Sequence, residues 1–162
     1  MARRVFFSFH YQRDSIRVSQ IRECNSITSH FEESPFIPAS AWESIKRQGP
    51  AAIKKWIDDQ MHYCGVVVVL AGFETASREW VKYELEKAHR EKKGIVCIDL
   101  AGMRNMLGQV DPSGTNPLRT AVDSQGNSLY SLNKYKTYSW ENNNGRSNVD
   151  EWIEEAAKNA GR

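Results

Sequence analysis

The chain has 162 residues, of which 40% are hydrophobic and 26% are charged, and its formal net charge is +2. This length and composition are typical of one globular domain with one core. The longest apolar run, residues 66–71, is too short to span a bilayer. The small net charge and the lack of a continuous basic stripe argue against a nucleic-acid-binding protein.

The cysteines and the first residues bear on the cellular compartment. Cys24, Cys64 and Cys97 are widely spaced, with no Cys-x-x-Cys pair. We therefore expect buried, reduced thiols and no metal site. The first residues run straight into a strand pattern without the apolar segment of a signal peptide, which predicts a cytoplasmic protein that is not bound to a membrane.

The first half of the chain alternates strand and helix signals. Residues 4–9 are β-rich and almost entirely apolar, which is typical of a strand buried on both faces. Asp14 is placed to cap a helix that extends to about residue 24, and residues 26–35 have the polar composition of a loop. A short strand is expected at 36–37. Ser40 and Glu43 form a capping-box pattern that predicts a helix start.

The alternation continues through the second half. Pro50 opens another helical segment, and residues 66–70 give the strongest strand signal in the chain. Ser77 is a plausible N-cap for a helix that runs to about residue 92, and residues 94–99 form the next buried strand. Residues 101–134 are mostly loop, residues 135–140 alternate like a last strand, and Asn148 opens a last helix.

Repeated strand–helix alternation predicts the α/β class, with a parallel sheet covered by helices on both faces and residues 1–162 forming a single domain. For the flavodoxin-like strand order 2-1-3-4-5, the winding reverses between the first and third strands. Ligands bind in such sheets beyond the carboxyl ends of the strands at this point. The predicted crevice therefore lies between residues 8–14 and residues 71–77.

The helix that follows the second of these loops carries the main candidate. Val81, Leu85 and Ala88 form its buried stripe, and Trp80 and Glu84 lie one turn apart on one edge of it. A carboxylate there would be partly dehydrated and still able to reach a ligand. The alternative is a solvated glutamate that pairs with Lys87.

Several common sites are excluded by missing motifs. The chain has no Gly-x-Gly-x-x-Gly, no Gly-x-x-x-x-Gly-Lys-Ser/Thr and no Gly-x-Ser-x-Gly sequence. The first and third predicted strands also lack the acidic residues that a phospho-accepting receiver domain needs. A Rossmann cofactor site, a P-loop and a hydrolase nucleophile elbow are therefore not expected.

Three sequence blocks resemble TIR-like domains, specifically the TIR-like subunit of bacterial Thoeris anti-phage systems. They are residues 4–11, 39–43 and 78–85, and the likeness covers roughly residues 3–100. The Trp-x-x-x-Glu of the family falls on Trp80 and Glu84. The chain departs from the family at Pro38, where an aspartate is frequent.

The resemblance implies an enzyme that cleaves the nicotinamide–ribose bond of NAD and releases a cyclic or otherwise modified ADP-ribose signal. NAD would be the substrate, with no separate cofactor, and a downstream effector protein would sense the nucleotide. Self-association is a further expectation, since TIR domains often assemble. Glu84 takes the catalytic role, because a carboxylate can stabilise an oxocarbenium-like sugar as nicotinamide leaves.

The remaining candidate residues lie on the same loops and helices. For four of them a structural role is equally open: a packed imidazole at His10, a buried loop aromatic at Phe73, a core anchor at Trp42 and an ion pair with Glu74 at Arg78. The candidate substrate-binding residues are Ser8, Phe9, His10, Tyr11, Trp42, Phe73, Arg78, Trp80 and Tyr83.

Two other functions fit the same predicted fold. A TIR-like interaction module without catalysis would not bind nucleotide, and its assembly would not depend on Glu84. A nucleoside deoxyribosyltransferase-like enzyme, which also uses a carboxylate on a related sheet, would turn over nucleosides instead of NAD.

Overall fold

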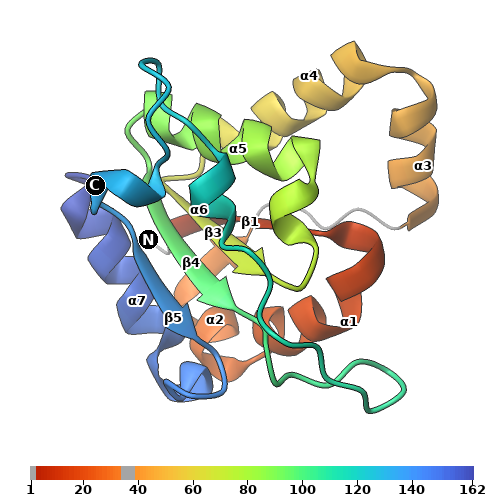
Figure 1. The fold of residues 1–162 in the computed structure, drawn as a ribbon, viewed down its shortest axis with the longest axis vertical. Helices are drawn as coiled ribbons and strands as arrows, with labels where there is room; N and C mark the ends of the chain where they lie inside the picture. Colours follow the sequence, from red (N-terminus) through yellow and green to blue (C-terminus); the bar gives the residue numbers. More distant parts are fainter. Residues whose placement is uncertain (1–2, 34–38) are drawn as a thin grey trace.

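The computed structural model describes residues 3–33 and 39–162 (Figure 1). Five parallel strands form one sheet in the order β2-β1-β3-β4-β5, which confirms the predicted α/β class and strand order. The strands are β1 (Arg3–Phe9), β2 (Phe31–Glu33), β3 (Val66–Ala71), β4 (Gly94–Asp99) and β5 (Lys136–Ser139).

Helices cover both faces of this sheet (Figure 1). One core lies between the sheet and α1, α2 and α7, and a second core lies between the sheet and α4, α5 and α6. The helices are α1 (Tyr11–Arg22), α2 (Asn25–His30), α3 (Ala39–Arg47), α4 (Pro50–Met61), α5 (Glu79–Arg90), α6 (Pro117–Thr120) and α7 (Gly145–Asn159), with two 3₁₀ turns, η1 (Thr75–Ser77) and η2 (Tyr130–Leu132).

The central strand β3 is an uninterrupted apolar run that is buried on both faces of the sheet. All six of its residues are buried, because successive side chains enter the two cores alternately. Its Cα partners run in register from Val66 opposite Val5 to Leu70 opposite Phe9. The carboxyl ends of β1 and β3 therefore lie side by side, where the predicted crevice was expected.

The segment after α1 differs from the prediction. Residues 26–35 were expected to be a loop, but α2 occupies Asn25–His30 and is followed directly by β2. α2 is polar and only Ile27 is buried, so no helical apolar stripe announces it. It packs against α7, a tertiary contact that local sequence does not reveal. The strand expected at 36–37 lies outside the described residues.

Three predicted helix caps are also wrong. α1 begins at Tyr11, and His10, not Asp14, accepts a hydrogen bond from the Arg13 amide. Ser77 ends the turn η1, so that Arg78 occupies the N-cap position of α5. α7 begins at Gly145, three residues before the expected cap. The side chain of Ser40, which the predicted capping box needs, lies outside the described part of the chain.

A buried ion pair ties α1 to the segment after β4. Arg17 donates to Asp14 Oδ1 at 3.0 Å and to the carbonyl oxygens of Met103 and Gln109, and it lies 3.1 Å from Asp111. Arg17 is 2% exposed and Asp14 is fully buried. The pair fixes residues 103–111 beside the start of α1.

Two further observations bear on the sequence predictions. The three cysteines are buried free thiols, as expected. In residues 3–33 and 39–162, no helix is long and apolar enough to cross a membrane.

Candidate active site

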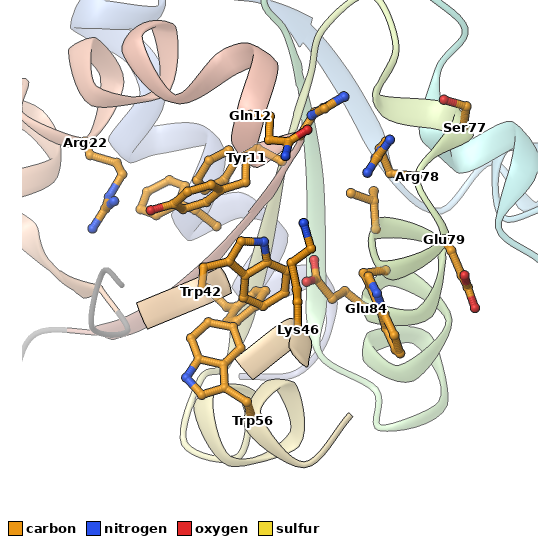
Figure 2. Close-up of a pocket in the computed structure, with 16 residues that line it drawn as sticks. Tyr11, Gln12, Arg22, Trp42, Lys46, Trp56, Ser77, Arg78, Glu79 and Glu84 are labelled. Atoms are coloured by element: carbon orange, nitrogen blue, oxygen red, sulfur yellow. The ribbon is translucent and has the colours of Figure 1, made fainter. Parts of the chain in front are cut away.

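A cavity of about 390 Å³ lies beside the carboxyl end of β1 (Figure 2). Its volume is in the range of small-molecule sites, about 300–1,000 Å³. β1, the start of α1, α3, α4 and the first turns of α5 all contribute to its lining. The predicted residues that line it are Phe9, His10, Tyr11, Trp42, Arg78, Trp80 and Glu84.

Glu84 is the buried carboxyl group of this cavity. Its side chain belongs to the second turn of α5, and the residue is 8% exposed. Burial raises the pKa of Glu84 to about 8, and the nearby Ser8 hydroxyl acts in the opposite direction. Among the described residues, no group hydrogen-bonds Glu84 Oε2. Glu84 is therefore largely protonated at neutral pH and holds an acceptor that a ligand can use.

The alternative in which Glu84 pairs with Lys87 is not realised. Lys87 Nζ donates to Glu91 at 2.6 Å and lies 3.5 Å from Asp58. The carboxyl group of Glu84 faces the sheet side of α5, whereas Lys87 is one of the residues between α5 and α4. Glu84 therefore has little contact with water. In such a place a carboxylate interacts strongly with a positive charge that develops on a ligand.

His10 joins the end of β1 to the start of α1 and is 6% exposed. Its Nδ1 accepts from the Arg13 amide at 3.3 Å, so Nε2 carries the proton in the neutral ring. Burial, and then the positive charge of Arg78, lower its pKa. His10 therefore presents a neutral imidazole to the cavity at pH 7 and also caps α1.

Three predicted residues lie outside the lining. Ser8 is buried beneath Glu84 on the strand face that α5 covers. Phe73 is 44% exposed, and the guanidinium group of Arg13 lies 5.4 Å from its ring centroid. Tyr83 donates to Asp58 Oδ1 at 2.7 Å and so links α5 to α4. The alternative in which Arg78 pairs with Glu74 is not realised, since Glu74 contacts Arg13 and His10 instead.

The sequence was compared with known proteins once this geometry was defined. The family described as "Thoeris protein ThsB, TIR-like domain" matches residues 6–105. A protein of Bacillus cereus (strain MSX-D12), named "Putative cyclic ADP-D-ribose synthase ThsB1", is 33% identical over 146 residues. That alignment covers 87% of this chain and 75% of the relative. The chain belongs to the ThsB family of TIR-like proteins.

The region matched by the ThsB family contains every residue that lines the cavity. It also includes the buried pair Asp14 and Arg17, whose role the sequence did not suggest. Residues 106–162 lie beyond the family match and complete the sheet and one core through β5 and α7.

Several lining residues of this ThsB-family chain were not predicted. Figure 2 shows Trp56 and Lys46 beside Trp42, with Arg22 to the left of Tyr11. Their sequence signals are those of ordinary helix residues. Lys46 and Trp56 reach the crevice because α3 packs on α4, and Arg22 reaches it from the end of α1. The unpredicted lining residues from helices outside the predicted crevice segments are Arg22, Lys46, Trp56 and Glu79. Gln12 and Ser77 lie in those segments but were not named as candidates.

The cavity is rich in positive charge. Arg22, Lys46 and Arg78 line it, whereas Glu79 is the one lining carboxylate besides Glu84 among the described residues. Lys46 lies 3.3 Å from Glu43, and Arg78 has no ion-pair partner in the part of the chain that the structure describes. Within residues 3–33 and 39–162, no group of three His, Cys, Asp or Glu side chains could hold a metal ion.

Proposed function

We propose that this chain cleaves the nicotinamide–ribose bond of NAD and converts the ADP-ribose part into a cyclic ADP-ribose-type signal. The observation that carries the proposal is Glu84, a buried carboxyl group whose Oε2 has no hydrogen-bond partner among the described residues, in a cavity whose volume is in the range of small-molecule sites. The name of the Bacillus cereus relative supports it.

The residues around Glu84 suit the parts of NAD. A positively charged lining favours the diphosphate, and the first turn of α5 has backbone N–H groups without a side-chain cap. Trp80 lies one turn before Glu84 and lines the same cavity, where its ring can pack against the nicotinamide or its ribose. We propose Ser8, Phe73 and Tyr83 as supporting residues that act from outside the lining.

The chemistry requires one carboxylate. When the C1′–N bond breaks, its electron pair leaves with nicotinamide, and the ribose becomes oxocarbenium-like. An ionised Glu84 stabilises this positive charge in a region of low dielectric. Nicotinamide departs as a neutral molecule, so no strong general acid is needed. We further propose that a separate effector protein senses the product and that the chain associates with itself.

The test is nicotinamide release from NAD by the purified full chain. Glu84→Gln should abolish release, whereas Glu151→Gln, an exposed position on α7, should leave it unchanged. Equal release by the wild-type protein and Glu84→Gln would overturn the role of Glu84. Absence of both NAD turnover and an NAD-dependent rise in Tm would favour the interaction module. Turnover of nucleosides in place of NAD would favour the deoxyribosyltransferase-like enzyme.

A further inference from the structure

The side of the cavity that faces α5 is a continuous row of aromatic rings. The Phe9 and Tyr11 rings stack at 5.8 Å between centroids, and Tyr11 lies 6.2 Å from Trp42. Trp42 in turn meets Trp56 edge to face at 5.7 Å. Figure 2 shows Tyr11, Trp42 and Trp56 following one another across the cavity from Arg78. We call Phe9, Tyr11, Trp42 and Trp56 the aromatic wall.

The aromatic wall is built from three separate parts of the fold. Phe9 ends β1, Tyr11 begins α1, and the two tryptophans come from α3 and α4. All four side chains are only partly buried and line the cavity. Rings that served the core alone would be covered on both faces, whereas these leave apolar surface open to a ligand.

The loop segment after β4 does not form this side of the cavity. Residues 101–134 contribute no side chain to the lining among the described residues. Arg17 and Asp111 hold the start of this segment against α1. The groups that face Glu84 across the cavity are instead the aromatic wall and Lys46.

NAD has two flat ring systems, and the structure offers one cavity with a carboxyl group on one side and rings on the other. We propose that the aromatic wall holds the adenosine half of NAD in the same cavity as the nicotinamide ribose, so that it decides between a cyclic and a linear product. This inference rests on the proposed function. Trp56 and Trp42 are then specificity-determining residues.

The two products share their first step and differ in the second. The C1′–N bond breaks and nicotinamide leaves with the electron pair. A lone pair of an adenosine hydroxyl or ring nitrogen then forms the new bond to C1′. An attacking hydroxyl passes its proton to the Glu84 carboxylate, whereas an attacking ring nitrogen carries no proton and takes the positive charge of the sugar onto the adenine. If water attacks instead, its oxygen forms the bond, its proton follows the same route, and linear ADP-ribose results. An adenosine half that stacks on the aromatic wall holds its attacking atom close to C1′ and excludes water, so the cyclic product is favoured.

The test measures the ratio of cyclic to linear product by mass spectrometry, together with total nicotinamide release. Base–aromatic stacking predicts that Trp56→Leu lowers this ratio by about tenfold or more while nicotinamide release persists. Trp42→Leu should act in the same direction. Tyr63→Leu is the matched control, because Tyr63 is 70% exposed and does not line the cavity. An unchanged ratio in both tryptophan variants would overturn the inference.

A binding measurement separates this inference from the proposed function. AMP serves as the probe of the adenosine half, and calorimetry reports its affinity without any turnover. We expect Trp56→Leu to weaken AMP binding by about tenfold and Tyr63→Leu to leave it unchanged. Equal AMP affinity in the wild-type protein and Trp56→Leu would overturn the aromatic wall even if NAD is cleaved. If the wild-type protein releases no nicotinamide from NAD but binds AMP through Trp56, the proposed function fails and the aromatic wall stands.

Discussion

Glu84 should lower the stability of the folded protein as the pH rises above about 5. Its pKa is about 8 in the folded protein and 4.5 in its ordinary state, so the folded chain binds the extra proton between these two values. The free energy of unfolding therefore falls as pH rises through this window. In this window the free energy of unfolding falls by about 1.4 kcal/mol for each pH unit, because the glutamate ionises in the unfolded chain and stays protonated in the folded one.

The replacement Glu84→Gln removes the titration and keeps the size of the side chain. The gain in the free energy of unfolding should be below about 1 kcal/mol at pH 5, about 3 kcal/mol at pH 7 and about 5 kcal/mol at pH 9. These values follow from the span between the pKa of 4.5 and the raised pKa of about 8. All three gains are upper limits, because water that enters the cavity lowers the cost of the charge.

Urea unfolding at pH 5, 7 and 9 measures this effect. With a denaturant slope of about 1–3 kcal/mol/M, a gain of about 3 kcal/mol moves the midpoint by roughly 1 M or more. Glu151→Gln, on the exposed side of α7, should change the midpoint little and equally at the three pH values. A gain for Glu84→Gln that is the same at pH 5 and pH 9 would refute the reasoning, since the effect must come from ionisation.

Three further predictions follow from the same structure. If the ionised Glu84 is required, kcat/KM for nicotinamide release should rise with pH towards a plateau above its pKa of about 8, and a profile that is flat from pH 6 to 9 would contradict this. Arg17→Met leaves the buried Asp14 without its ion-pair partner and should lower the free energy of unfolding by about 3–5 kcal/mol in urea titrations. The double variant Asp14→Leu with Arg17→Met should recover most of the lost stability. Gly94→Ala would place a Cβ 2.7 Å from the Ala156 carbonyl oxygen, so thermal unfolding should show a loss of stability of about 1–3 kcal/mol. Gly65→Ala is the control and should show no such loss, because its Cβ would lie 3.9 Å from Cδ of Arg162.

The sequence predicts well where apolar patterning decides the structure. The runs at β1, β3 and β4 could only be buried strands, and the stripe of Val81, Leu85 and Ala88 correctly predicts the buried face of α5. Together they place the crevice, because parallel strands expose their carboxyl ends on one edge. The edge position of Glu84 on that stripe follows from the same periodicity.

The features that the sequence did not reveal depend on tertiary contacts. The sequence predicts Asp14 as a helix cap and gives Arg17 no role, yet both are buried. Arg17 donates to Asp14 Oδ1, and the segment after β4 supplies the carbonyl oxygens that accept its other hydrogen bonds. Trp56 reads as a core residue of α4, and only α3 packing beside α4 turns its ring towards the cavity. α2 is a polar helix that exists because α7 lies against it.

The two sides of the cavity also differ in how they are anchored to the rest of the fold. Glu84 stands on α5, which packs on β1, β3 and β4, whereas α3 packs principally on α4. Amide hydrogens of β3 should thus exchange with solvent only when the whole domain unfolds, and those of α3 through smaller openings. The side that carries the carboxyl group is held as firmly as the sheet itself. On the opposite side, Phe9 ends β1 and α4 buries Ile53, Ile57 and Met61 in the second core, so α3 with Trp42 is the part whose opening disturbs the sheet least.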